Sequence, residues 1–419
     1  MRDFKNDDGH MIFGGMRAAD IADKFGTPVY VTDENILREN YRRIYGVFSK
    51  HMPTRVHYAC KANSSLAVLK ILEQEGSHID AVSIGEVLTC MKAGFPASRI
   101  LYTGTCVSTP ELKAVADLGV MINIDSVSEL ERLAKINPNI PISIRVTPGI
   151  GSGHSDKVVT GAKGSKFGIP IDLAMGTFRR AMELGLKVKG IHAHIGSGGK
   201  GIGPLIDAVA VLIDLTNQIR DELEIELEFI NMGGGIGVPY RPNEPEEDLE
   251  ELAATVTDMI LNDTSVGILA LEPGRYVVCD STVLLTRCVD VKKSGVKNYV
   301  CVDAGFNTLI RPAFYDSYHH VAIANKFNKA GTGKYDVVGP ICESGDFLAK
   351  DRALPAPEDG DIVAVYNCGA YSFAMSSTYN SRPRCREVLV KDGKAELIRG
   401  SETMDDLWRH QTIPERLLK

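Results

Sequence analysis

The feature that most restricts the fold of this chain is an alternation of short β-branched runs with helical patterns between about residues 56 and 272. Such an alternation is typical of βαβ units that build a parallel sheet. Eight runs in a row favour an α/β fold with a (β/α)8 TIM-like barrel, and a doubly wound open sheet is the alternative. The runs are residues 56–60, 79–82, 100–103, 121–124, 142–146, 190–195, 228–232 and 267–272.

The pattern changes after about residue 275, where β-rich segments with Gly and Pro turns replace the alternation. Asp392 and Gly393 stand between two apolar runs and predict a tight hairpin. We therefore expect two domains in this chain of 419 residues. One is the barrel, over residues 35–275, and the other is an antiparallel β domain, a sandwich or barrel, built from residues 1–34 and 276–419.

Composition excludes several classes of protein. The 47 basic and 54 acidic residues give a net charge of −7, which argues against a nucleic-acid partner. The longest notable apolar run, residues 209–215, contains Asp214, and the first ten residues have no apolar signal core. Nine cysteines without a CxxC pair indicate a reduced chain with no metal site. We expect a cytoplasmic protein that does not bind membranes.

Lys61 closes the first strand run and is followed by a polar turn. Enzymes with this barrel place their chemistry at the carboxyl ends of the strands, so Lys61 is expected at the barrel mouth. Partial burial there disfavours the ammonium, and a neutral amine can form a Schiff base with a carbonyl. A lysine that only caps the barrel rim is the structural alternative.

Two further candidate site motifs, a pair of histidines and a run of glycines, lie at the ends of the sixth and seventh runs. Gly233, Gly234 and Gly235 would let backbone N–H groups approach a phosphate, which barrels of this type often bind after strands seven and eight. A tight turn is the simpler interpretation. His192 and His194 lie two residues apart, so a strand would point both to one side. A metal pair, a ring-stacking imidazole and a buried core histidine all remain possible there.

Glu272 ends the eighth run and needs a cationic partner if it stays ionised in the barrel centre. Arg275 could be that partner in a structural ion pair. A protonated ring nitrogen on a cofactor would serve equally well. A lysine, a phosphate loop, a ring-stacking histidine and a carboxylate can together bind one molecule, pyridoxal 5′-phosphate.

Longer motifs extend over nearly the whole chain, and they are YACKAN (58–63), SKFGI (165–169), HAHIGS (192–197), NMGGGIG (231–237), LEPGR (271–275), IRPAFYDSYH (310–319), GPICESGD (339–346) and CGAYSFAMSSTYNSRPR (368–384). Together they resemble the diaminopimelate decarboxylases, which are fold type III, alanine-racemase-like enzymes that depend on pyridoxal 5′-phosphate. The resemblance implies a barrel followed by a β domain. It also implies decarboxylation of meso-2,6-diaminopimelate to L-lysine and CO2, the last step of lysine biosynthesis.

The resemblance further implies a role for each matching residue. Lys61 would carry the cofactor as a Schiff base, His194 would stack on its ring, and Glu272 would face the pyridine nitrogen. The remaining cofactor-binding residues would be Ser197, Gly233, Gly234, Gly235, Pro273, Gly274, Arg275 and Tyr371. The substrate would contact Arg275, Arg311, Tyr315, Glu343 and Tyr371.

Cys342 would donate the proton that replaces CO2. The family places Cys342 and Glu343 in the barrel of the partner subunit, which implies a homodimer with a shared active site. The nearest alternative is a decarboxylase of the same cofactor class and fold that acts on another or a modified amino acid. Such an enzyme would keep Lys61, Glu272 and Cys342 but alter Arg311 or Glu343, and both are present here.

Overall fold

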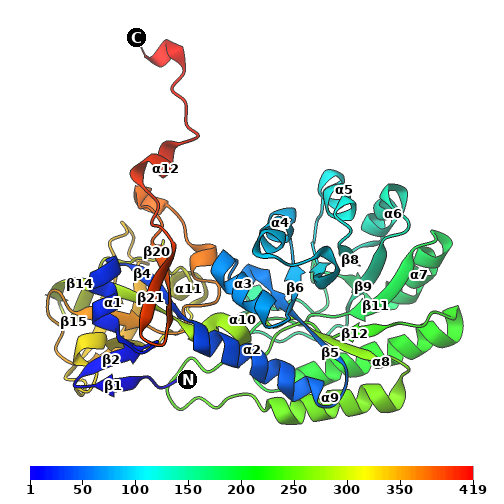
Figure 1. Ribbon diagram of the computed structural model, residues 1–419, viewed down its shortest axis with the longest axis horizontal. Helices are drawn as coiled ribbons and strands as arrows, with labels where there is room; N and C mark the ends of the chain where they lie inside the picture. Colours follow the sequence, from blue (N-terminus) through cyan, green and yellow to red (C-terminus); the bar gives the residue numbers. More distant parts are fainter. Residues whose placement is uncertain (419) are drawn as a thin grey trace. The chain divides into compact units, whose positions relative to one another are not determined.

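The structure is a computed structural model in which residues 1–418 are described. The chain forms two compact units (Figure 1). The first, called the barrel unit, contains residues 36–239 and 243–279, with Met1 assigned to it. The second, called the β unit, contains residues 2–35, 240–242 and the described part of the chain from 280. Within the described residues, no helix is both long and apolar enough to cross a bilayer.

The barrel unit contains a closed ring of eight parallel strands. Their order around the ring is β9, β11, β12, β13, β5, β6, β7, β8, and β8 pairs with β9 to close it. This closure confirms the predicted barrel and excludes the open sheet. The strands are β5 (Thr54–Ala59), β6 (His78–Ala81), β7 (Ile100–Tyr102), β8 (Met121–Ile124), β9 (Pro141–Thr147), β11 (Lys187–His192), β12 (Phe229–Asn231) and β13 (Ile268–Leu271).

Helices cover the outside of this ring (Figure 1). Some of these helices begin at a side-chain cap: the Ser126 hydroxyl accepts from the Glu129 N–H at 3.2 Å and caps α6. The Glu129 carboxylate accepts from the Asp125 N–H, one residue earlier than a capping box requires. The helices are α2 (Glu34–Ser49), α3 (Leu66–Gln74), α4 (Ile84–Ala93), α5 (Thr109–Asp117), α6 (Val127–Ile136), α7 (Ile171–Glu183), α8 (Gly203–Leu223), α9 (Leu249–Asp263) and the short α10 (Arg275–Val278).

The β unit is organised around a nine-stranded sheet. Its main path runs β18, β17, β15, β14, β4, β20, β21, and β19 with β16 branches from β14. Strand β4 comes from the N-terminal segment and pairs with β14 and β20. The strands are β4 (Val29–Asp33), β14 (Thr282–Ser294), β15 (Lys297–Val302), β16 (Val321–Ile323), β17 (Gly333–Val338), β18 (Phe347–Leu354), β19 (Ile362–Val365), β20 (Arg386–Lys391) and β21 (Lys394–Arg399).

This sheet is mixed, whereas we expected it to be antiparallel. Strands β4 and β20 are parallel, and so are β15 and β17. Both pairs are joined by long stretches of chain, so no tight turn forces an antiparallel direction. The hairpin of β20 and β21 is antiparallel as predicted, because Asp392 (φ 48°) and Gly393 (φ 78°) both adopt the positive φ that a two-residue turn needs.

Buried side chains from several strands form the core of the β unit. Leu284 on β14, Val300 on β15 and Val365 on β19 are each inaccessible to solvent. The Tyr30 ring joins this core, and its hydroxyl donates to the Thr308 carbonyl oxygen at 2.6 Å. Smaller elements complete the chain: β1 (Lys5–Asp7), β2 (His10–Phe13), β3 (Met16–Arg17), β10 (Ile169–Pro170), α1 (Ala18–Phe25), α11 (Arg311–Tyr315) and α12 (Met404–Trp408).

Candidate active site

Lys61 lies directly after strand β5, in a single 3-10 turn formed by Cys60–Ala62. Its Nζ donates to Oδ2 of Asp80 at 2.6 Å, and about a third of its side chain is exposed. Asp80 lies on the neighbouring strand β6 and is fully buried. Lys61 is therefore held at a strand end by a buried carboxylate and still open to a ligand.

Asp80 is a site residue that the sequence analysis missed. Burial raises its pKa, Lys61 opposes this effect, and the nearby Glu272 carboxylate adds to it. Its Oδ1 has no hydrogen-bond partner among residues 1–418. The sequence does contain a signal for this residue, since Asp80 is acidic and lies within the apolar run IDAV. A carboxylate buried in such a run needs a partner, which marks it as a candidate site residue.

Glu272 follows strand β13 and is 4% exposed. Its Oε1 accepts from Asn231 Nδ2 at 2.8 Å, and its Oε2 lies 3.0 Å from His192 Nε2. Burial alone would favour the protonated acid, but His192 holds the pKa of Glu272 well below its usual range. The group therefore stays a carboxylate at the centre of the barrel.

The structure does not pair Glu272 with Arg275, the structural alternative suggested by the sequence. The Arg275 guanidinium donates from Nη2 to the Ser197 hydroxyl at 3.0 Å. Arg275 is 5% exposed and lies at the start of α10. Ser197 and Arg275 thus place a hydroxyl and a cation together, a combination suited to a phosphate.

His194 lies beyond the end of β11 and makes different contacts from His192. Its Nδ1 accepts from the Gly234 N–H at 3.0 Å. Burial, followed by the charges of Lys61 and Arg145, lowers the pKa of His194 well below its ordinary value. The ring is therefore neutral, with its proton on Nε2, and His192 is engaged with Glu272. The arrangement does not favour the metal pair.

The glycine loop after β12 packs directly against neighbouring backbone. A Cβ on Gly234 would lie 2.3 Å from the Glu272 carbonyl oxygen, and one on Gly233 would lie 2.5 Å from that of Ala193. Side chains are excluded here, as a backbone cradle for an anion requires. Pro273 and Gly274 continue this packing: the Pro273 carbonyl accepts from Ala59 N–H at 3.3 Å, beside the Lys61 turn.

The three glycine amides are not equivalent. Gly233 donates to the Asn231 side chain at 2.9 Å, and Gly234 donates to His194. Within residues 1–418, the Gly235 amide has no acceptor. Two of the three predicted phosphate donors are therefore used to position Asn231 and His194, and Gly235 is the one whose N–H remains available for an anion.

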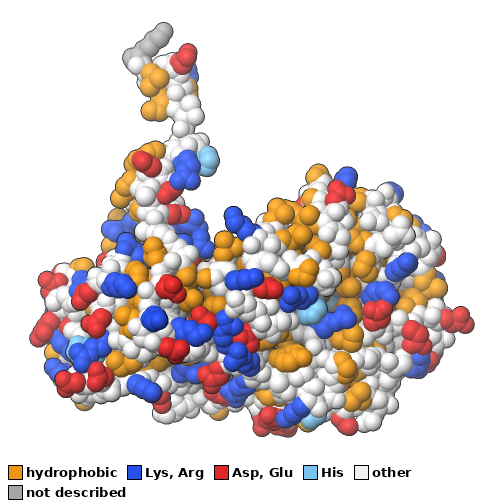
Figure 2. All heavy atoms as spheres, in the orientation of Figure 1, with side chains coloured by type: hydrophobic (Ala, Val, Ile, Leu, Met, Phe, Trp, Pro, Cys, Tyr) orange, Lys and Arg blue, Asp and Glu red, His pale blue; other side chains and the backbone are white. Residues whose placement is uncertain are grey.

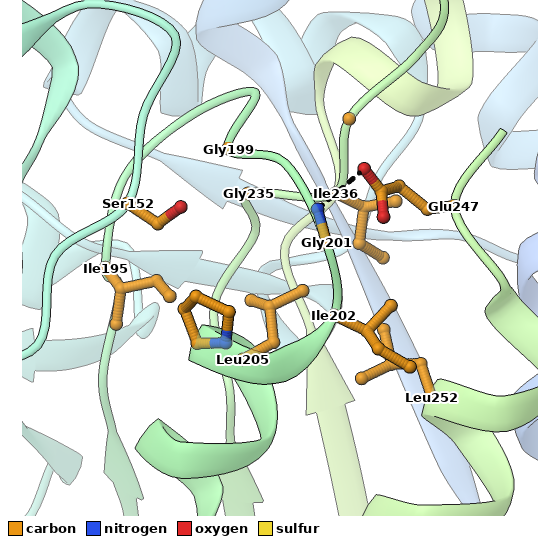
Figure 3. Close-up of a pocket in the computed structure, with 12 residues that line it drawn as sticks. Ser152, Ile195, Gly199, Gly201, Ile202, Leu205, Gly235, Ile236, Glu247 and Leu252 are labelled. Atoms are coloured by element: carbon orange, nitrogen blue, oxygen red, sulfur yellow. Dashed lines mark hydrogen bonds between the residues drawn. The ribbon is translucent and has the colours of Figure 1, made fainter. Parts of the chain in front are cut away.

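A small pocket adjoins Gly235 (Figure 3). It lies near the start of α8, and the Gly201 N–H donates to Glu247 Oε1 there at 3.0 Å. The Glu247 carboxylate in its lining disfavours binding of a second anion there. The lining residues are Ser152, Ile195, Gly199, Gly201, Ile202, Pro204, Leu205, Gly235, Ile236, Gly237, Glu247 and Leu252.

Arg311 is the most deeply buried cation of the β unit, at 1% exposed. Its Nη1 donates to Tyr240 Oη at 2.9 Å and lies 3.0 Å from His319 Nε2. Its Nη2 donates to the Ser317 hydroxyl at 3.3 Å. Among residues 1–418, no carboxylate lies within ion-pair distance of Arg311. A buried guanidinium with neutral partners is suited to binding an anionic ligand.

Cys342 and Glu343 lie on an exposed loop of fixed shape. The buried Asp346 carboxylate accepts from the Ile341 and Phe306 N–H groups at 2.7 and 2.6 Å. Cys342 donates its backbone N–H to Asn380 Oδ1 at 2.9 Å. Glu343 accepts from the Tyr379 hydroxyl at 2.7 Å. Cys342 is exposed, which rules out the small buried hydrophobe that an unreactive cysteine usually is.

The two remaining predicted residues also belong to the β unit. Tyr315 ends α11, one turn after Arg311, and its ring meets Phe314 edge-on at a centroid distance of 4.7 Å. Tyr371 is half-buried and has a left-handed backbone (φ 57°), which is uncommon for a bulky residue. Such strain is often found at binding sites.

Residues 36–279, over half of the chain, match the family model described as "Pyridoxal-dependent decarboxylase, pyridoxal binding domain". The barrel, its strand-end lysine and its buried carboxylate agree with this description. The protein is therefore a pyridoxal-dependent decarboxylase by family.

The relatives narrow this class further. The chain is 49% identical to diaminopimelate decarboxylase of Methanothermobacter thermautotrophicus, covering 99% of this chain and 98% of the relative. It is 41% identical to diaminopimelate decarboxylase of Archaeoglobus fulgidus, covering 99% of this chain and 100% of the relative. The crystal structure of diaminopimelate decarboxylase from M. jannaschii in complex with L-lysine superimposes with a TM-score of 0.93, at 32% identity and over 99% and 98% of the two chains. Within its class, the chain belongs to the diaminopimelate decarboxylase family.

Proposed function

We propose that this protein decarboxylates meso-2,6-diaminopimelate to L-lysine and CO2 with pyridoxal 5′-phosphate as cofactor. The observation that carries the substrate assignment is the buried Arg311, which has no carboxylate partner among residues 1–418. A simple diamine precursor has only an ammonium at its far end, and Arg311 would repel it. Diaminopimelate has a second carboxylate there, which a guanidinium binds well.

The barrel unit has the residues to hold the cofactor. Lys61 would be its covalent attachment point, and His194 would lie against its ring. Ser197, Gly235 and Arg275 would bind the phosphate, and Glu272 would accept a hydrogen bond from the ring nitrogen. When bound, pyridoxal 5′-phosphate withdraws the electron pair released as the Cα–carboxylate bond breaks.

Two carboxylates of the chain, Glu272 and Asp80, would hold or accept protons next to this cofactor. The low pKa of Glu272 keeps it ionised, so it holds a proton on the ring nitrogen. The raised pKa of Asp80, caused by burial, makes it a suitable acceptor for the proton that Lys61 Nζ must lose before the amine can react with a carbonyl.

The far end of the substrate is assigned to the β unit. Arg311 and Tyr315 would bind its carboxylate, with Arg275, and Glu343 would bind its ammonium. Tyr371 would contact both substrate and cofactor. Once CO2 has left, the Cys342 thiol would transfer its proton to the substrate Cα. Both Cys342 and Glu343 are exposed in the single chain, which supports a homodimer in which they complete the partner's active site.

A reducing compartment suits this chemistry, because the Cys342 thiol must stay reduced. None of the nine cysteines, all within residues 1–418, forms a disulfide. We propose the cytoplasm as the location.

The test is CO2 release by the cofactor-loaded protein from meso-diaminopimelate, lysine, ornithine and arginine. Only the first should be a good substrate, and Arg311→Ala should lower its kcat/KM by about 100-fold or more while cofactor content stays constant. Preference for ornithine or lysine would reassign the protein to the alternative, a decarboxylase of another amino acid. A protein with no borohydride-reducible chromophore at Lys61 would contradict the cofactor assignment itself.

A further inference from the structure

Asn231 connects the glycine loop to Glu272. It is the last residue of β12 and is fully buried. Its Oδ1 accepts from the Gly233 N–H at 2.9 Å, and its Nδ2 donates to Glu272 Oε1 at 2.8 Å. The first contact, to a backbone amide two residues further on, is an Asx turn that begins the glycine loop and so sets the direction of the Gly235 N–H.

The order of the strands explains why these groups meet. Asn231 pairs with His192 on β11 and with Ala270 on β13. Side chains two positions apart in a strand lie on the same face, so Glu272 follows the face of Ala270 and reaches both Asn231 and His192. Three neighbouring strands therefore bring the contacts together inside the barrel.

Only an amide can make both contacts of Asn231. The Gly233 N–H needs an acceptor, whereas the Glu272 carboxylate needs a donor. An asparagine side chain has one of each on a single planar group. An aspartate in its place has no N–H for Glu272, and a leucine of similar size can make neither contact.

Glu272 depends on these contacts because it is remote from water. Charged side chains are spread over the face of the molecule drawn in Figure 2, where water stabilises them. Glu272 is only 4% exposed, and the loss of a donor to such a carboxylate costs free energy. Its backbone N–H also donates to the Gly233 carbonyl at 2.8 Å. The glycine loop and Glu272 are thus joined twice, once through Asn231 and once through the main chain.

We propose that Asn231 is a positioning residue that aligns the two ends of the cofactor site with each other, the glycine loop at the phosphate and Glu272 at the ring nitrogen. This inference rests on the proposed function, which assigns Gly235 and Glu272 to those two ends. Because its amide is engaged with Gly233 and Glu272, Asn231 acts through them and not on the cofactor itself.

The test compares the affinity of the full-length protein for three ligands: pyridoxal 5′-phosphate, pyridoxal, which lacks the phosphate, and the 1-deaza analogue of the cofactor, in which CH replaces the ring nitrogen. Absorbance titration gives a dissociation constant for each. The phosphate ratio is the constant for pyridoxal divided by that for the cofactor, and the ring ratio is the constant for the 1-deaza analogue divided by the same value. A merely loosened fold weakens all three ligands alike and leaves both ratios unchanged.

Asn231→Leu should lower both ratios by about 10-fold, because both ends of the site lose their alignment. Asn231→Asp keeps the acceptor for Gly233 but places a like charge beside Glu272, which disfavours the ionised form of that carboxylate. This variant should lower the ring ratio by about 10-fold and leave the phosphate ratio within about twofold of the wild type. A decrease in only one ratio for Asn231→Leu, or equal effects on both ratios for Asn231→Asp, overturns the proposal.

Asn123→Leu is the matched control. Asn123 is a fully buried asparagine on β8, and its Oδ1 accepts from the Ser143 hydroxyl at 2.7 Å. We expect this variant to leave both ratios unchanged, and a decrease like that of Asn231→Leu would contradict a specific role for Asn231. A wild-type protein that binds no cofactor refutes the proposed function, and with it this inference. Large ratios in the wild type that persist in both Asn231 variants refute this inference alone.

Discussion

His319 Nε2 lies 3.0 Å from Arg311 Nη1, and its Nδ1 lies 2.8 Å from the Tyr366 carbonyl oxygen. The carbonyl can only accept, so Nδ1 carries the proton and Nε2 accepts from Arg311. A neutral imidazole thus holds the guanidinium without neutralising it. A carboxylate in the same place would remove the charge that a substrate carboxylate needs.

Replacement of His319 tests this relationship. His319→Gln should raise the KM for diaminopimelate by about 10-fold with little change in kcat, because Arg311 loses an oriented hydrogen bond but keeps its charge. A merely structural role would instead lower both stability and kcat. His320→Gln is the matched control, because it leaves the contact between His319 and Arg311 intact. Steady-state kinetics with equal KM values for the two variants would contradict the assignment.

The carboxylate of Glu272 gives a second prediction. Glu272→Gln keeps the size of the side chain and removes the charge that would hold a proton on the ring nitrogen. We expect kcat to fall by about 100-fold or more while bound cofactor stays near one per chain. Stopped assays of CO2 release, combined with absorbance of the bound cofactor, measure both quantities. Glu247→Gln is the control, and comparable kcat values for the two variants would refute the role of Glu272.

Gly234 allows a test of the loop packing. Gly234→Ala places a Cβ 2.3 Å from the Glu272 carbonyl oxygen, so the backbone must move or the fold must loosen. We expect a loss of about 1–3 kcal/mol in the free energy of unfolding and weaker cofactor binding. Gly267→Ala meets no atom within 4 Å and serves as the control. Urea unfolding and cofactor titration that fail to distinguish the two variants would show that the loop adapts.

Glu129 predicts a pH dependence of stability. Burial raises its pKa from 4.5 to about 7, so its protonated form is favoured in the folded state. The associated stability is complete below pH 4.5 and is lost as the pH rises through about 7, up to about 3 kcal/mol. Glu129→Gln should remove this loss. The free energy of unfolding of the variant, relative to that of the wild type, should therefore be higher at pH 8 than at pH 5.

Urea unfolding of wild type and variant at the two pH values measures this difference. Glu131→Gln, at a partly exposed residue of the same helix, should follow the wild type at both pH values. Parallel pH curves for wild type and Glu129→Gln would show that Glu129 is ionised in both the folded and unfolded states.

The sequence by itself determined the barrel, the hairpin at Asp392-Gly393, and the placement of Lys61 and Glu272 at strand ends. These features depend on periodicity, turn chemistry and order along the chain, all of which are local. The same local patterns also predicted that the chain changes from alternating strand and helix units to a β-rich region. The motifs near Arg311 and Cys342 added the family resemblance.

Only the tertiary structure decided which groups meet. Asp80 pairs with Lys61 across 19 positions of sequence, His192 with Glu272 across 80, and Tyr240 with Arg311 across 71. It also decided that Gly233 and Gly234 use their amides inside the protein, and that β4 lies parallel to β20. These pairings arise from ring closure and sheet order. Because hydrogen bonds and charges act over a few ångströms of space, no local pattern in the chain can specify their partners.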